Sequence, residues 1–143
     1  MRNLRDIKIY IASAYTKGDE AMNVKFQVDV FNILFDMGFC PIVPLVSHFL
    51  HLVNPRPYTD WIEYDNAQLS MYDCCLRFNH IPSSGADGEE EQFKAMNKPV
   101  FNNFYQLNLF YGGDIDDKTL LAIENLKFPT EKGTYPEWAK KED

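Results

Sequence analysis

The sequence predicts an α/β fold: a single domain with a doubly wound, mostly parallel sheet of about four or five strands and helices on both faces. Short apolar runs rich in β-branched and aromatic residues alternate along the chain with segments of helical periodicity. The connections between these segments are short, as in parallel sheets covered by helices. A length of 143 residues suits one domain that buries a core without disulfides or a metal.

The first part of the chain is expected to form two strands around one long helix. The helix begins at Asp19 and ends at Met37, because Gly38 stops it. Its two apolar stripes cover more than half of its circumference, which is more than one face of a sheet can bury. The expected elements are a strand at 7–12, a loop at 13–18, the helix at 19–37, a second strand at 39–44 and a helical turn within 45–53.

The rest of the chain continues the same alternation. Asp60 is expected to begin a helix, because Glu63 follows three residues later in the spacing of a capping box, and this helix runs to about Tyr72. The further expected elements are a strand at 73–79, a polar loop at 80–88, a helix at 89–96, a strand at 98–101 and a helix at 117–127. The domain is assigned to residues 1–128, and residues 129–143 form a polar C-terminal tail.

The composition excludes several classes of partner and cofactor. The chain has 14 Lys and Arg residues against 21 Asp and Glu residues, a net charge of −7, which excludes nucleic-acid polymers and anionic membranes as partners. Three cysteines without a C-x-x-C spacing indicate reduced thiols. His48 and His51 have no Cys, Asp or Glu near them at metal-ligand spacing, so no metal or other cofactor is expected. The N-terminal apolar run is too short for a signal peptide or a membrane span, and we expect a cytoplasmic protein.

Ligands of parallel sheets bind beyond the carboxyl ends of the strands, which selects the loops at 13–18, 44–60 and 80–88. The most informative stretch, SSGADGEEE at 83–91, joins a strand to a helix, and its small residues and free amides can approach a ligand closely. The helix dipole is expected to keep Glu89 ionised, as a carboxylate nucleophile must be. On spacing alone, Glu89, Glu90 and Glu91 fit ordinary first-turn acids that the dipole favours, without a catalytic role.

These segments resemble the nucleoside 2-deoxyribosyltransferase family over about residues 7–101. The most specific element is Ser-x-Gly-x-x-x-Glu followed by a proline ten residues after the glutamate, which Ser83, Gly85, Glu89 and Pro99 match. The family also contains N-hydrolases that act on nucleoside 5′-monophosphates. The other matching elements are IYIASAYT at the first strand, Gly38 before Pro41 and Pro44, Asp65 eight residues before Asp73, and KPV at 98–100.

The resemblance implies cleavage of an N-glycosidic bond, with Glu89 as the nucleophile, Tyr15 orienting it and Asp65 assisting the leaving base. Tyr15 could equally be an ordinary loop aromatic, and Asp65 a solvated acid. Ser83 favours a 5′-phosphorylated substrate, because a hydroxyl can donate a hydrogen bond to phosphate and an acid there would repel it. The further expected substrate contacts are Ser13, Thr16, Lys17, Ser84, Gly85 and Trp61.

Two departures from the family pattern leave alternatives open. The loop SAYTKG lacks the richer Ser/Arg/Gly composition of the hydrolase branch, and Phe93 stands where a small residue is usual. A deoxyribosyltransferase that exchanges bases is one alternative. The others are a nucleotide-binding module without turnover and a flavodoxin-like interaction domain without a small ligand.

Aromatic residues make up 15% of the chain and gather in two segments. Exposed apolar patches usually mark interfaces, and the family forms oligomers in which a neighbouring subunit completes the site. We therefore expect a homodimer or higher homo-oligomer that uses these segments. Their rings are Phe26, Phe31 and Phe35 in the first helix, and Phe104, Tyr105, Phe110 and Tyr111 after the fourth strand.

Overall fold

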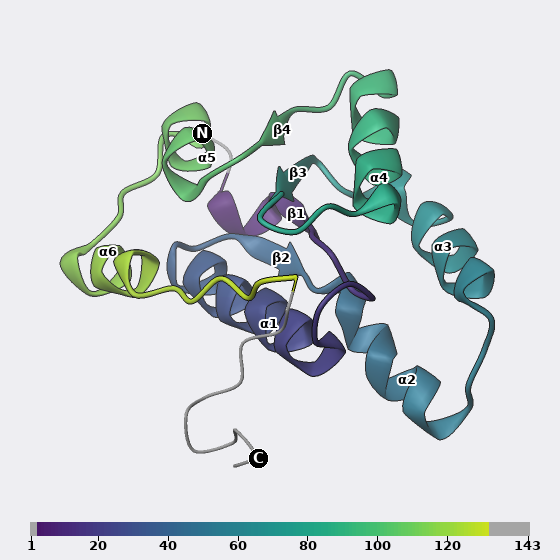
Figure 1. Cartoon of the computed structure of the whole chain (residues 1–143). Helices are drawn as coiled ribbons and strands as arrows, with labels where there is room; N and C mark the ends of the chain where they lie inside the picture. The colour runs from purple at the N-terminus through teal and green to yellow at the C-terminus, as the bar shows by residue number, and fades with distance from the viewer. Residues whose placement is uncertain (1–2, 132–143) are drawn as a thin grey trace, which may run out of the picture.

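The computed structural model describes residues 3–131 and confirms the α/β fold with helices on both faces of a parallel sheet (Figure 1). The strands are β1 (Lys8–Ala12), β2 (Cys40–Ile42), β3 (Cys74–Arg77) and β4 (Val100–Phe101). The α-helices are α1 (Glu20–Asp36), α2 (Ser47–Val53), α3 (Tyr58–Asn66), α4 (Ser84–Ala95), α5 (Phe104–Tyr111) and α6 (Asp117–Glu124). Short 3₁₀ turns lie at Leu4–Asp6, Pro44–Val46 and Leu69–Met71.

The sheet has the strand order β2-β1-β3-β4, with every neighbouring pair parallel. Tyr10 in the middle of β1 pairs with Ile42 on one side and with Cys75 on the other. The chain moves outward from β1 to β2 and then crosses back to β3. The point at which the strand order reverses therefore lies between β1 and β3, where such sheets bind their ligands.

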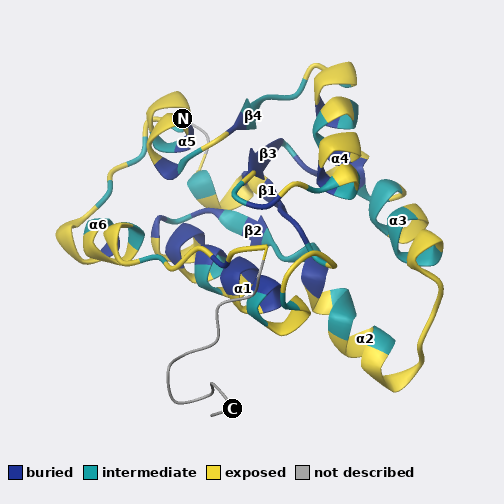
Figure 2. Ribbon diagram, in the orientation of Figure 1, coloured by how far each residue is buried: buried dark blue, intermediate teal, exposed yellow. Residues whose placement is uncertain are grey.

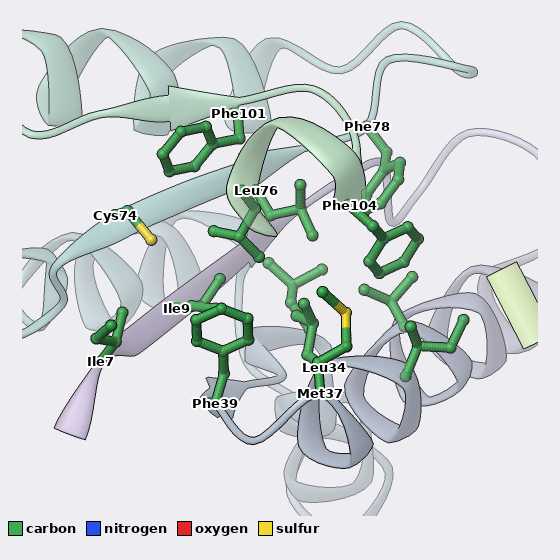
Figure 3. Packing of buried hydrophobic residues seen from close by; sticks show 14 of the residues in the cluster. Ile7, Ile9, Leu34, Met37, Phe39, Cys74, Leu76, Phe78, Phe101 and Phe104 are labelled. Carbon is green, nitrogen blue, oxygen red and sulfur yellow. The ribbon is translucent and has the colours of Figure 1, made fainter. Parts of the chain in front are cut away.

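The two faces of the sheet bury different clusters, because successive residues of a strand point to opposite faces. Ile9 and Ile11 pack with α1 and α5 in the larger cluster, which Figure 3 shows around Leu34, Phe39 and Leu76. Tyr10 and Ala12 join the smaller cluster beneath α4. Figure 2 shows the buried strands between these helices and the more exposed helix α2 outside them.

Helix α1 begins and ends where its capping residues predict. The Asp19 carboxylate accepts a hydrogen bond of 2.8 Å from the backbone N–H of Met22 and caps the helix. Gly38 follows the end of the helix with a φ of +101°, a left-handed conformation that favours glycine. The expected helix at 19–37 is thereby confirmed.

The expected start of the next helix was wrong. Helix α3 begins at Tyr58 rather than Asp60, and it ends at Asn66, short of Tyr72. Pro57 precedes its first residue with a φ of −55°, so the chain already has a helical φ before Asp60 is reached, and no side chain caps this end. The capping box of Asp60 and Glu63 therefore does not form.

Helix α5 was not expected, although its ends carry ordinary signals. The Asn103 side chain caps its start through the N–H of Gln106 at 2.9 Å, and Gly112 ends it with a φ of +69°. Phe104 of α5 and Phe26 of α1 are buried in the core, so these two rings of the expected interface segments are unavailable to a partner. Phe35, Tyr105 and Phe110 remain exposed.

The expected C-terminal tail lies mostly outside the described residues. In its described part Pro129 is buried, and a Cβ on Gly18 would meet the carbonyl oxygen of Thr130 at 2.7 Å. The chain after α6 therefore packs against the loop that follows β1 (Figure 1). None of the helices described here is long and apolar enough to cross a membrane.

Candidate active site

A narrow cleft with a cavity volume of about 50 Å³ opens beyond the carboxyl ends of β1 and β3. The loop after β1, the helices α2 and α3, and the start of α4 form its walls. Lys17 and Ser84 do not line this cleft, and Ser84 borders a neighbouring groove between α3 and α4. The expected site residues that the cleft brings together are Ser13, Tyr15, Thr16, Trp61, Asp65, Ser83, Gly85 and Glu89.

Helix α4 begins at Ser84, five residues before the expected start. The Ser83 hydroxyl oxygen accepts a hydrogen bond of 3.1 Å from the Ala86 N–H and caps the helix, so Glu89 lies beyond the first turn. Glu89 shares the buried face of α4 with Ala86 and Phe93 and is only 9% exposed.

The neighbouring glutamates of this stretch point elsewhere. Glu90 and Glu91 form ion pairs with Lys94, with nitrogen-to-oxygen distances of 3.2 and 3.8 Å. The Glu91 side chain is 73% exposed. Of the three consecutive glutamates only Glu89 lines the cleft, because residues one and two positions further along turn about 100° and 200° around the helix.

The pKa of Glu89 is raised to about 8, chiefly by burial. The Tyr10 hydroxyl and the Arg77 charge oppose this rise, and the Asp65 charge adds to it. The expectation that the helix dipole keeps Glu89 ionised was therefore wrong. The dipole acts within the first turn of a helix, whereas Glu89 lies in the second turn and is desolvated.

Asp65 faces the same cleft from α3. Burial raises its pKa to about 6. At neutral pH the pair of carboxyl groups therefore holds one proton, with the pKa of Glu89 above that of Asp65. Pairs of acids whose environments separate their pKa values are the usual basis of acid–base assignments in active sites.

Tyr10, not Tyr15, is the tyrosine beside Glu89. The Tyr15 hydroxyl is hydrogen-bonded to Nδ1 of His48 at 2.5 Å, and burial raises its pKa to about 12. Burial followed by the charges of Glu89 and Asp65 raises the pKa of Tyr10. The alternation of β1 points Tyr10 toward α4, a signal that the sequence already contained.

The Tyr10 side chain is fixed by aromatic neighbours on both sides. It is 1% exposed, and its ring centroid lies 5.2 Å from that of Tyr72 and 5.7 Å from that of Phe93. Phe93 is therefore part of the wall that holds Tyr10. The Tyr10 hydroxyl is buried beside Glu89, and its interaction with that carboxyl group lowers the pKa of Glu89.

Comparisons of the chain with protein-family models, with curated proteins and with solved structures found no match. The function is therefore argued from the site. No group of three or more His, Cys, Asp or Glu side chains that could hold a metal ion occurs within residues 3–131.

Arg77, which sequence patterning treated only as a strand residue, lies at the end of β3 beneath α4. It is 4% exposed, and its Nη2 atom lies 2.9 Å from the Asp87 carboxylate in the first turn of α4. Its Nε and Nη1 atoms are buried without a hydrogen-bond partner among the described residues. Arg77 thus ties the strand to the helix that carries Glu89 and places a positive charge near that carboxyl group.

Buried amides hold the loop after β1 in place. The Asn23 side chain donates 2.8 Å hydrogen bonds to the carbonyl oxygens of Tyr15 and Lys17, so its role is to shape the loop. The Gln27 amide donates to the Ser13 hydroxyl oxygen at 2.9 Å. Ser13 and Ser83 both accept an N–H, so both hydroxyls keep a hydrogen that can be donated to a ligand.

The wall formed by α2 and α3 contains residues that the sequence did not single out as site residues. Ser47, His51 and Tyr58 line the cleft beside Trp61. The Trp61 indole N–H donates a 3.0 Å hydrogen bond to Nδ1 of His51. The three-residue spacing of His48 and His51 on α2 was the available signal, because it places both rings on one side of a helix.

Proposed function

We propose that this protein cleaves the N-glycosidic bond of a nucleoside or deoxynucleoside 5′-monophosphate and releases the free base and a sugar phosphate. The observation that carries the proposal is the pair formed by Glu89, which is buried, and Asp65, which is half-buried, two carboxyl groups with separated pKa values in one cleft. Glycosidic cleavage requires one ionised carboxylate and one protonated carboxylic acid. The pair holds that single proton near neutral pH.

In the first step the proton of the pair, which Glu89 holds more tightly in the free protein, passes to Asp65. Glu89 then attacks C1′ as a carboxylate, and a C1′–O bond forms while the C1′–N bond breaks. Asp65 donates the shared proton to the leaving base. In the second step a water oxygen attacks C1′, its proton passes to the Asp65 carboxylate, and Glu89 leaves. The enzyme returns to its starting protonation state, and the net reaction consumes one water molecule.

Donors at the mouth of the β3–α4 connection support a phosphorylated substrate. Ser83 keeps a hydroxyl hydrogen for a ligand, and Gly85 lines the cleft at the N-terminal turn of α4, where helix amides favour anions. The buried Arg77 adds positive charge beneath the same turn. These groups allow a protein of net charge −7 to bind one phosphate locally.

The test is a panel of nucleosides and 5′-monophosphates incubated with the wild-type protein, with free base measured by chromatography. Glu89→Gln is the matched variant, and circular dichroism checks that it folds. We expect base release from monophosphates by the wild type and its loss in the variant. Undiminished release by Glu89→Gln would reject Glu89 as the nucleophile, and nucleotide binding without any base release would favour a non-catalytic binding module.

A base-exchange transferase would use the same residues with a second base in place of water. Adding a different free base to the reaction separates the two activities. Formation of a new nucleotide would assign the protein as a transferase, and formation of free sugar phosphate would assign it as a hydrolase.

A further inference from the structure

The imidazole of His51 has one defined tautomer in the structure. Its Nδ1 atom accepts two hydrogen bonds, one of 3.0 Å from the Trp61 indole N–H and one of 3.1 Å from the backbone N–H of Arg56. Both of these groups can only donate. The Nδ1 atom is therefore unprotonated, and the ring proton of the neutral imidazole lies on Nε2.

The same two bonds fix the orientation of the ring. His51 belongs to α2, Arg56 to the connection that follows it, and Trp61 to α3, so the imidazole joins three successive segments. The planes of the His51 and Trp61 rings are inclined at 76°. A donor held in this way loses little conformational freedom when it binds a ligand.

His51 lines the cleft that contains Glu89. We propose that His51 is a specificity-determining residue whose Nε2–H donates a hydrogen bond to an unprotonated oxygen of the substrate; this inference rests on the proposed function. The oxygen belongs either to the 5′-phosphate or to a carbonyl group of the base, and the two share the property of accepting without donating.

Two other groups of the cleft also direct a hydrogen-bond donor toward the ligand. The hydroxyl oxygens of Ser13 and Ser83 each accept an N–H from the protein, as Nδ1 of His51 does. In each case the protein occupies an acceptor and leaves a hydrogen available for donation. A site arranged in this way selects ligands rich in acceptors and rejects an analogue that lacks the matching oxygen.

Two substitutions separate the two nitrogen atoms of the ring. An asparagine amide can replace Nδ1 as the acceptor for Trp61 and Arg56, whereas a glutamine amide reaches the position of Nε2. Binding is measured by calorimetry in a Glu89→Gln background, which removes turnover, with a deoxynucleoside 5′-monophosphate and the matching deoxynucleoside as ligands. Thermal unfolding of each variant reports the structural role.

We expect His51→Asn to keep its thermal stability and to weaken binding about tenfold to a hundredfold, the loss for one hydrogen bond to a polar or charged acceptor. His51→Gln should keep its affinity within about threefold and lose stability, because Trp61 and Arg56 then lack their acceptor. A loss with the monophosphate alone identifies a phosphate oxygen. A loss with both ligands identifies an oxygen of the base.

Equal losses of affinity in both variants, or no loss in His51→Asn, would overturn the inference. A second readout needs no substrate: ¹⁵N NMR of the imidazole, assigned with His51→Asn, should show a protonated Nε2. A protonated Nδ1 would overturn the role of His51 and leave the proposed function standing. If the wild type releases no free base from any nucleoside or 5′-monophosphate, the proposed function itself is wrong, whatever the tautomer of His51.

Discussion

The Tyr10 hydroxyl and the Glu89 carboxyl group lie together beneath helix α4, and the two residues are only 1% and 9% exposed. Tyr10 comes from the central strand and is held by the rings of Tyr72 and Phe93. Its hydroxyl interacts with the Glu89 carboxyl group and lowers the pKa of Glu89. A donor therefore stands beside the carboxyl group that we propose as the nucleophile.

The first prediction concerns this hydroxyl. Tyr10→Phe should lower kcat by about tenfold to a hundredfold, because Glu89 loses the donor that favours its ionised form. Thermal unfolding checks that the variant keeps its fold, because the Tyr10 side chain is 1% exposed and packs in the core. Tyr15→Phe is the matched control, because its hydroxyl contacts His48. A larger loss of kcat in Tyr15→Phe than in Tyr10→Phe would contradict the assignment.

The second prediction concerns the stability of the protein at high pH. The folded pKa of Glu89, about 8, lies above its ordinary value of 4.5, so the folded state binds the proton more tightly than the unfolded state. The stability that this group contributes is complete below pH 4.5 and is lost as the pH rises toward 8. Glu89→Gln cannot ionise, so it should match the wild type at pH 5 and exceed its free energy of unfolding by a few kcal/mol at pH 8.5. Denaturant unfolding at both pH values measures this difference, and an unchanged difference between them would show that Glu89 is not desolvated.

The third prediction is a bell-shaped dependence of kcat/KM on pH. Activity requires one proton on the pair of Glu89 and Asp65, and the two pKa values are about 8 and about 6. The rate should therefore be highest near neutral pH and fall on both sides. In Asp65→Asn the Glu89 pKa should decrease, because the charge that raises it is gone. A profile with the same two limbs in Asp65→Asn would exclude Asp65 from the pair.

The fourth prediction concerns the close contact between α3 and α4. A Cβ on Gly85 would lie 2.7 Å from the Tyr58 hydroxyl oxygen and 3.3 Å from the Ile62 side chain. Gly85→Ala should push the Tyr58 ring into the cleft and raise KM several-fold, with little loss of stability because the ring end can move. Adding Tyr58→Phe removes the nearest oxygen and should restore KM. Failure of the double variant to recover would place the defect elsewhere.

The fifth prediction concerns the oligomer. Leu109 on α5 is 84% exposed beside the exposed ring of Phe110, and Val53 on α2 is 88% exposed. We expect at least a dimer that uses the α5 surface, so Leu109→Glu should yield a monomer at micromolar concentration while Val53→Glu does not. Solution scattering measures both. A monomeric wild type would contradict the oligomer, and dissociation by Val53→Glu alone would move the interface to α2.

Local signals in the sequence predicted much of the fold. Asp19 and Gly38 bound α1 as expected, because a cap and a left-handed glycine act on the few residues beside them. Competing local signals produced the errors. Pro57 begins α3 ahead of Asp60, and Ser83 caps α4 so early that Glu89 lies beyond the first turn.

Periodicity and turn residues, which can be read along the chain, were enough to predict the alternation of strands and helices, the α/β class and the loops at which a ligand site belongs. The tertiary structure alone decided which side chains meet in that site. Tyr10, Asp65 and Glu89 come from three elements far apart in the chain, and only their packing places one hydroxyl beside two carboxyl groups. The packing also sets the pKa values of Glu89 and Asp65, because desolvation depends on what covers a carboxyl group and not on its neighbours in sequence.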